Sequence, residues 1–313
     1  MRVAVAVVAA VSAAAFIALP APLGPGGAPS AAHPQAAASP PAPALVDVNA
    51  LVHEAQQVQR ADALAWSRFR FHRQIRTERL DASGAVLESG HLEFEIMPLT
   101  VGGFDERLLR IDGRAPTAEE ITQYREEASF SKHYSTLTVV DHEEGEESGY
   151  SLSTLLRLSA YQYAGIDAID GQPAHRLDFA PDPLPHGSGV AARVTQAMAG
   201  SLWLTVEGAH LVRARAATVR PVSLFLGLGK VHALEVRVES APAGPMAPGV
   251  YLPKSLSINT DLRVLFTNQH RRREFAYSGF ALVAPHPGPP DASTSAAPSR
   301  SEPAGTSAGG GSR

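Results

Sequence analysis

Three potential metal ligands alternate along one predicted strand, namely His91, Glu93 and Glu95. An imidazole and two carboxylates are ligand types that zinc and iron accept in proteins. Residues two apart on a strand lie roughly 7 Å from each other, so three in a row do not converge on one ion. Arg70, on the preceding predicted strand, supplies an opposite charge. The pattern therefore indicates a solvated charge ladder, and we expect no metal site.

The other potentially reactive groups do not form a catalytic set. The acidic run at 141–147 lacks the alternating oxygen ligands and the fixed glycine of a calcium loop, so it indicates a solvated loop. The segment 187–189, Gly-Ser-Gly, lacks the flanking residues of a nucleophile elbow. The chain contains no cysteine, which excludes thiolate catalysis, cysteine zinc sites and disulfides. We therefore expect a non-enzymatic protein with no catalytic residues and no cofactor.

The net charge is −4, and the only dense basic cluster is Arg271–Arg273. A protein that binds nucleic acid would carry a longer basic stripe or patch, so we expect no nucleic acid partner. We interpret the cluster as the exposed start of a strand. Its alternative role is a contact to a lipid head group.

Large apolar side chains recur at alternating positions of predicted strands, which would place them on one side of a sheet. Such a side is ordinary core if other elements cover it, and a binding surface if a ligand covers it. Large apolar cavities with few polar groups favour acyl chains. The candidate lining residues are Phe69, Phe71, Ile75, Leu92, Phe94, Ile96, Trp203 and Phe225.

These side chains depend first on a hairpin near the start of the folded region. Residues 66–80 and 85–97 alternate between apolar and polar positions, and a turn-forming segment separates them. With a four-residue turn, Phe71 faces Phe94, and basic residues on the polar face meet acidic ones. Because one turn length satisfies both faces, the sequence predicts an antiparallel hairpin in this register.

The remaining elements form a succession of strands with few helices. Thr117 and Glu120 form a capping box, and Asp170-Gly171 is a strong signal for a two-residue hairpin turn. This order indicates a mainly β (α+β) protein with one curved antiparallel sheet and two or three covering helices. We expect helices at 47–65, 117–130 and 152–158, and further strands at 104–111, 161–169, 172–179, 198–206, 209–217, 221–239, 250–267 and 271–283.

The two ends differ in composition from the middle of the chain. Arg2 precedes an apolar run that ends at Pro20, which is typical of a secretory signal peptide, with an uncleaved membrane anchor as the alternative. We assign 1–38 to the signal peptide and a flexible Ala/Pro leader, and 284–313 to a disordered tail rich in Pro, Ser, Ala and Gly. The folded domain is then 46–283.

Several local phrases accompany this order of elements, notably 106–109 (Glu-Arg-Leu-Leu), 170–177 (Asp-Gly-Gln-Pro-Ala-His-Arg-Leu), 200–204 (Gly-Ser-Leu-Trp-Leu) and the later Leu252-Pro253. With them, most of 46–283 resembles the outer-membrane lipoprotein carriers of the LolA and LolB kind and their relatives LppX and RseB. The resemblance implies a LolA-like half-barrel whose apolar concave face is covered by helices, with acyl chains bound between sheet and helices.

Together, the residues and the resemblance predict a monomeric envelope protein, periplasmic or secreted, that binds a lipid, a lipoprotein acyl chain or another apolar ligand on the concave face. Its expected partner is a lipid or an acylated protein. The alternative is a non-enzymatic interaction or regulatory module of the RseB kind, which binds an envelope protein partner instead.

Overall fold

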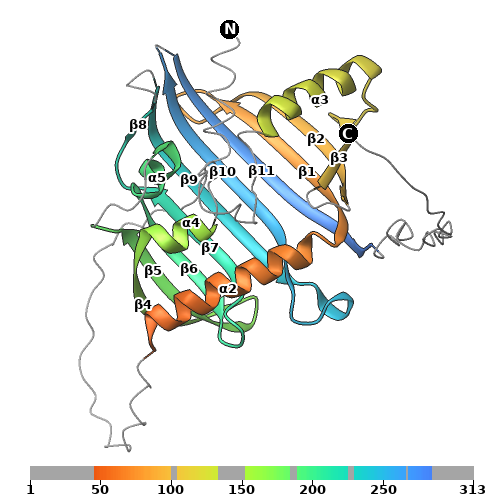
Figure 1. Ribbon diagram of the computed structural model, residues 1–313. Coiled ribbons are helices and arrows are strands. Elements are labelled where there is room, and N and C mark those ends of the chain that lie inside the picture. Colours follow the sequence, from red (N-terminus) through yellow and green to blue (C-terminus); the bar gives the residue numbers. More distant parts are fainter. Residues whose placement is uncertain are drawn as a thin grey trace, which may run out of the picture. The chain divides into compact units, whose positions relative to one another are not determined.

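The computed structural model describes residues 46–99, 104–132, 152–183, 189–224, 229–265 and 267–283 (Figure 1). These residues build one antiparallel sheet of eleven strands that is not closed into a barrel. The mainly β fold with a single open sheet, expected from the sequence, is therefore confirmed. The predicted leader, the acidic run at 141–147, Phe225 and the predicted tail lie outside the described residues.

The sheet has the strand order β3-β2-β1-β11-β10-β9-β7-β6-β5-β4, and the short β8 pairs with β9. The last strand of the chain therefore lies beside the first, and β3 and β4 are the two edges. The strands are β1 (Phe69–Leu80), β2 (Val86–Pro98), β3 (Phe104–Ile111), β4 (Ser159–Ile169), β5 (Gln172–Pro181), β6 (Met198–Thr205), β7 (Leu211–Thr218), β8 (Val222–Leu224), β9 (Gly229–Pro242), β10 (Tyr251–Val264) and β11 (Thr267–Leu282).

Four α-helices of the described ranges lie on one side of this sheet, which we call the inner face (Figure 1). They are α2 (Val48–Trp66), α3 (Ala118–Lys132), α4 (Leu152–Leu158) and α5 (Gly189–Thr195). The sequence predicted the first three, but α5 was missed because four of its seven residues are glycine, valine or threonine, which have low helix propensity. No helix within the described ranges is long and apolar enough to cross a bilayer.

The β1–β2 hairpin forms as predicted, but its predicted register is wrong by two residues. Phe71 faces Ile96, and Phe94 faces Arg73. The carboxylate of Asp81 accepts hydrogen bonds from the backbone N–H groups of Ser83 and Ala85, which lengthens the turn, and a register shift follows at Leu80. A shift of two residues leaves every side chain on its predicted face, so the apolar face survives the error.

Helix α2 seals the part of the inner face that lies over β4–β7, β9 and β10. Asp47 caps its first turn by accepting hydrogen bonds from the N–H groups of Asn49 and Ala50. Leu51, Val52 and Ala55 follow one face of the helix and are buried in the largest hydrophobic cluster. That cluster, which we call the sealed core, also holds residues of α4, α5 and the neighbouring strands.

A buried polar contact fixes the second half of α2. Asp62 is 7% exposed, and its Oδ2 lies 2.8 Å from Nδ1 of His210, while its Oδ1 accepts a hydrogen bond from the backbone N–H of Tyr251. The rings of His210 and Tyr251 stack at 4.5 Å. Burial raises the pKa of Asp62, and the two hydrogen bonds oppose that rise. The contact therefore ties the C-terminal part of α2, four residues before Trp66, to His210 just before β7 and to Tyr251 at the start of β10.

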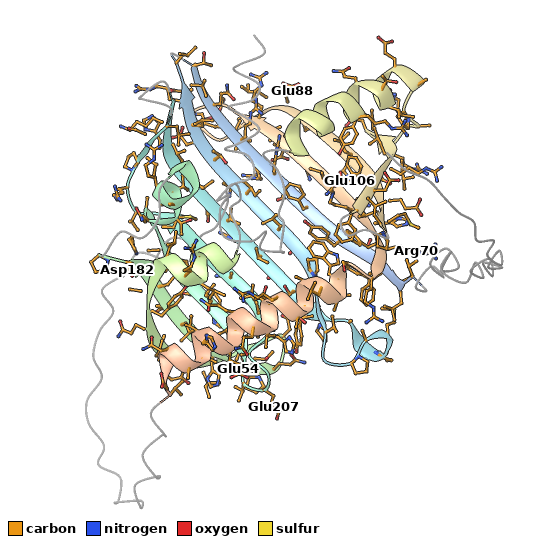
Figure 2. All side chains as sticks on the ribbon, in the orientation of Figure 1. Glu54, Arg70, Glu88, Glu106, Asp182 and Glu207 are labelled. Carbon is orange, nitrogen blue, oxygen red and sulfur yellow. The ribbon has the colours of Figure 1, made fainter. Side chains whose placement is uncertain are left out.

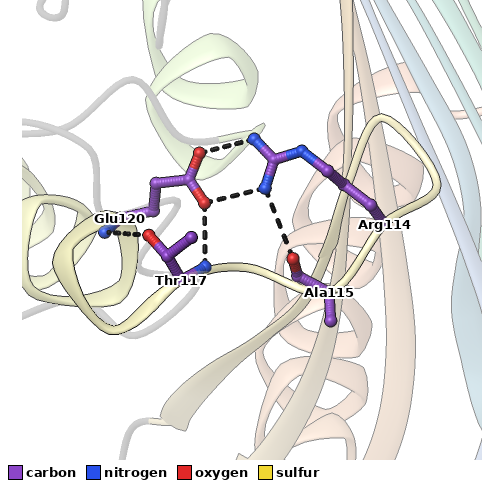
Figure 3. A network of polar contacts seen from close by, with 4 residues as sticks. All are labelled: Arg114, Ala115, Thr117 and Glu120. Carbon is purple, nitrogen blue, oxygen red and sulfur yellow. Dashed lines mark hydrogen bonds and ion pairs between the residues drawn. The ribbon is translucent and has the colours of Figure 1, made fainter.

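Helix α3 begins at the predicted capping box (Figure 3). The hydroxyl of Thr117 accepts a hydrogen bond from the Glu120 N–H at 3.2 Å, and the Glu120 carboxylate accepts one from the Thr117 N–H at 2.8 Å. Arg114 binds the same carboxylate through both Nη atoms, at 2.9 and 2.6 Å. Arg114 and the Thr117 N–H lower the pKa of Glu120 to about 2.

The Asp62 contact predicts a large loss of stability for Asp62→Ala. The substitution leaves His210 and the Tyr251 N–H without their partner in a buried place, which costs about 2–4 kcal/mol of unfolding free energy. Urea denaturation measures this cost. Glu54→Ala, on the exposed side of the same helix (Figure 2), is the matched control and changes stability by about 0.5 kcal/mol or less. Equal effects of the two substitutions would contradict the account.

The capping box predicts that α3 loosens in acid. Because the folded pKa of Glu120 lies below the ordinary value of 4.5, its contribution is full above about pH 4.5 and is lost as the pH falls toward 2. Hydrogen-exchange protection factors of residues 118–125 should fall through that window. Glu120→Gln should show the loosened helix at every pH, whereas Glu119→Gln in the same turn should behave as wild type. A wild-type helix with pH-independent protection would rule out this role.

Candidate functional site

The inner face changes character at the end of α2, where the sealed core gives way to a set of aromatic and aliphatic side chains on β1, β2, β3 and β11, together with one residue each from α2 and α3. We call this set the aromatic cluster. Four of its members are buried, and eight more are only partly buried. The buried members are Phe71, Phe94, Ile96 and Leu108, and the partly buried members are Trp66, Ile75, Leu92, Phe104, Ile111, Tyr124, Tyr277 and Phe280.

The aromatic rings of this cluster gather around Phe71 and Trp66. The ring of Phe71 stacks on Phe280 at 5.1 Å and lies 5.5 Å from Trp66 and 5.6 Å from Phe104. Such tilted and offset pairs stabilise each other beyond the area that they bury. Trp66 is the last residue of α2, so the helix that seals the core also supplies an aromatic side chain at the border of the cluster.

Helix α3 lies over the β1–β3 end of the sheet (Figure 1), and Tyr124 joins it to the cluster. The ring of Tyr124 lies 5.0 Å from the ring of Phe94, and its hydroxyl donates a hydrogen bond to Oε2 of Glu106 at 3.0 Å. Burial raises the pKa of Tyr124, and the neighbouring Glu106 carboxylate adds to this rise. Tyr124 is therefore neutral and able to donate at any physiological pH.

One ion pair lies within this apolar surface. Arg73 donates to Glu106 through Nη1 at 3.1 Å and Nη2 at 2.7 Å, and its guanidinium lies 4.9 Å from the centre of the Phe94 ring. Burial disfavours the charge on Arg73, but Glu106 outweighs burial and the pKa of Arg73 is raised. Glu106, labelled in Figure 2, thus neutralises a cation that would otherwise be uncompensated next to the rings.

The structure brings together five of the predicted lining residues, since Phe71, Ile75, Leu92, Phe94 and Ile96 all belong to the aromatic cluster. Phe69 lies in an adjoining cluster with Leu252, and Phe280 contacts the rings of both Phe69 and Phe71. Phe225 lies outside the described residues.

Trp203 is placed apart from the other predicted lining residues. On β6, Leu202 and Leu204 belong to the sealed core, so Trp203 between them points to the opposite, outer face of the sheet. There its Nε1 donates to Asp167 at 2.8 Å, and the guanidinium of Arg176 lies 5.7 Å from its ring. The expectation that Trp203 lies on the same face of the sheet as Phe71 is therefore wrong.

Sequence reasoning missed the polar members of the site, Arg73, Glu106 and Tyr124. Arg73 occupies an inner-face position of β1, but it stands in a stretch that contains four other arginines, and it was assigned to neither face. The alternation of side chains along the strand could have placed it, because Arg73 is two residues from both Phe71 and Ile75 and therefore lies on their face. Glu106 gave a weaker signal, since its strand is short.

The row of His91, Glu93 and Glu95 lies on the outer face and forms a charge ladder with β3. Arg110 lies 3.8 Å from Glu93, and Arg107 lies 3.6 Å from Glu95. Among the described residues no group of three or more His, Cys, Asp or Glu side chains is arranged to hold a metal ion.

The outer face also carries an open hollow of about 690 Å³ over β1, β2, β10 and β11. Gln74, Arg76, His91, Ser257 and Glu274 are among its lining residues, so polar and charged side chains border the hollow. It lies on the other side of the sheet from the aromatic cluster, so it is separate from the predicted lining residues gathered there.

Comparison with solved structures finds similar folds at low sequence identity. A protein domain assigned to outer membrane lipoprotein sorting, from Vibrio parahaemolyticus, is 9% identical with a TM-score of 0.32, over 77% of this chain and 94% of that chain. A LolA superfamily protein from Nitrosomonas europaea is 10% identical with a TM-score of 0.29, over 77% and 95%. A chain of the MucA/MucB complex of Pseudomonas aeruginosa is 12% identical with a TM-score of 0.23, over 75% and 99%.

No family model and no curated protein matches the sequence. The solved structures nevertheless include the LolA-like group that the sequence resembles. At these identities and TM-scores the likeness concerns the fold alone and carries nothing about ligand or partner.

Proposed function

We propose that this chain is an exported envelope protein that binds a lipid, a lipoprotein acyl chain or another apolar ligand at the aromatic cluster, and that it is not an enzyme. In this proposal residues 1–38 form the signal peptide and leader, 46–283 the binding domain and 284–313 the tail, and the mature protein is periplasmic or secreted. The observation that carries the proposal is the incomplete covering of the aromatic cluster, most of whose apolar members are only partly buried.

The contrast with the sealed core gives this observation its weight. Both clusters lie on the inner face of one sheet, and eight partly buried side chains pack against each of them. Among the described residues, the sealed core also holds 25 buried residues, most of them on the strands and on α2, α4 and α5, whereas the aromatic cluster holds only four. Leaving apolar surface in water costs about 25 cal/mol per Å², so an apolar ligand that covers it is favoured. Each methylene of an acyl chain that becomes buried there adds about 0.8 kcal/mol.

The chemistry of the cluster favours a chain over a polar molecule. The charged groups at the cluster, Arg73 and Glu106, neutralise each other, and the Tyr124 hydroxyl is engaged with the same carboxylate. The rest of the cluster is aromatic and aliphatic and presents no converging polar groups to orient a polar substrate. Because Tyr124 belongs to α3, movement of α3 would widen access to the rings.

The experiment is native mass spectrometry of the mature protein from its own envelope fraction, followed by organic extraction. Wild type should carry a lipid. Ile75→Glu and Leu92→Glu, at partly buried positions of the cluster, should lower the lipid-bound fraction roughly tenfold or more, because a carboxylate in an apolar site is strongly disfavoured. Leu87→Glu, at an exposed position of the same strand as Leu92, is the matched control and should retain the lipid.

Two outcomes would overturn the proposal. A wild-type protein that has its sequence mass, and keeps it after incubation with lipid vesicles, does not bind lipids. A protein that co-purifies with an envelope protein instead, through a contact that Ile75→Glu abolishes, is an interaction or regulatory module. Circular dichroism of each variant shows that the fold is intact.

A further inference from the structure

Strand β11 carries a polar stripe on the inner face, next to the aromatic cluster. Phe275 faces Ile75 on β1 and Leu256 on β10, so its side chain lies on the inner face with theirs. Counting back by twos from Phe275 gives Arg273, Arg271 and Gln269 on the same face. Counting forward gives Tyr277, a member of the aromatic cluster. One strand therefore joins the rings to two arginines.

Arg272, which lies between Arg271 and Arg273 in the sequence, points to the outer face. Arg272 donates to Glu78 at 3.0 Å and to Asn259 at 3.3 Å, and Glu78 also pairs with Arg76 at 2.8 Å. The outer-face arginine of the run is thus compensated by a carboxylate. The question is then whether the two inner-face arginines, Arg271 and Arg273, also have a carboxylate partner.

Arg273 has no such compensation. Its Nε is shielded from solvent and makes no hydrogen bond, and within the described ranges Arg273 takes part in no ion pair. Its neighbours in register are Thr77 on β1 and Ile258 on β10, neither of which is charged. Burial and the nearby Arg271 lower the pKa of Arg273 to about 10, so the side chain still carries its charge at neutral pH. A partly buried cation without an anion is unfavourable for the protein alone.

The positive charge extends across two strands. Arg271 faces Arg79 of β1, and Arg79 shares its charge with Glu88 at 3.0 Å. Glu88 (Figure 2) is 70% exposed, and among the described residues it is the one carboxylate that forms an ion pair with any of these three inner-face arginines, namely with Arg79. Gln269 extends the stripe, and its Oε1 is also shielded and without a donor. Three cations, one exposed carboxylate and an unsatisfied acceptor suit an anion that carries hydroxyl groups.

We infer that Arg271 and Arg273 bind the anionic head group, phosphate or carboxylate, of an amphiphile whose chains lie on the aromatic cluster. The inference rests on the proposed function and adds a ligand class to it. Arg273 and Tyr277 are four residues apart on β11, about 14 Å, which a single acyl chain can bridge. The arginines lie on the same face of β11 as the apolar residues, directly before them in the sequence. A head group with an attached acyl chain can therefore contact both the arginines and the aromatic cluster, whereas a free anion can contact only the arginines.

The test compares three probes on the purified full-length mature protein by isothermal titration calorimetry. They are a lysophosphatidylglycerol, a monoacylglycerol with the same chain, and inorganic phosphate. Wild type should bind the phosphate-bearing lipid about tenfold more tightly than the neutral one, as expected for a charge-assisted hydrogen bond. Arg273→Met should reduce that ratio to about one, and should raise the melting temperature of the ligand-free protein because the uncompensated cation is gone.

Arg263→Met, at an exposed position of β10, removes the same charge from the other face and should leave the ratio unchanged. Equal binding of both lipids by wild type, or a ratio that Arg273→Met does not alter, overturns the head-group site while the proposed function stands. If neither lipid binds, both fail. If inorganic phosphate binds in an Arg273-dependent way with no preference between the lipids, the site takes a free anion and the head-group inference is wrong.

Discussion

An open sheet with one apolar face must have that face covered by something other than itself. Here β3 and β4 end the sheet without pairing to each other among the described residues, so closure into a barrel does not bury the inner face. Helices take over this role, and α2 is the longest of them. The buried contact of Asp62 with His210 and Tyr251 holds α2 at the place where it can seal the core.

The position of the candidate site follows from where this helix ends. Beyond Trp66 the inner face continues over β1, β2 and β3, but the cover there is α3, which meets the cluster through Tyr124. An ionic bond between Arg73 and Glu106 allows a charged pair to lie among the rings without a net charge. Arg273 differs from Arg73 in having no carboxylate, and this difference separates a structural ion pair from a site that is open to an external anion.

The sequence was informative wherever one face of a strand was apolar and the other polar. The β1–β2 hairpin, β3 and the Asp170-Gly171 hairpin were predicted close to their observed bounds, because a period of two and a turn signal agree there. The hairpin register was not predictable from charge pairing, because the Asp81 side chain lengthens the turn. The segment expected to be one strand at 221–239 contains β8 and β9, a division that alternation does not reveal.

Site prediction failed where both faces of a strand resemble each other in sequence. On β6, Leu202, Trp203 and Leu204 are all apolar, so pattern alone could not assign Trp203 to the outer face. The run Arg271–Arg273 poses the same difficulty with charged residues. Among the described residues, Arg272 on the outer face pairs with Glu78, whereas Arg271 and Arg273 on the inner face have no ion pair, and three identical residues in a row do not show this difference. Only the register with β1 and β10 separates them.

The chain has two tryptophans, Trp66 at the border of the aromatic cluster and Trp203 on the outer face, and they allow a direct test of where an apolar ligand binds. The measurement is quenching of tryptophan fluorescence by a lipid with brominated acyl chains, in the single-tryptophan variants Trp203→Phe and Trp66→Phe. The account predicts strong quenching of Trp66 and little quenching of Trp203. Quenching of Trp203 alone, or of neither residue, would contradict binding at the aromatic cluster.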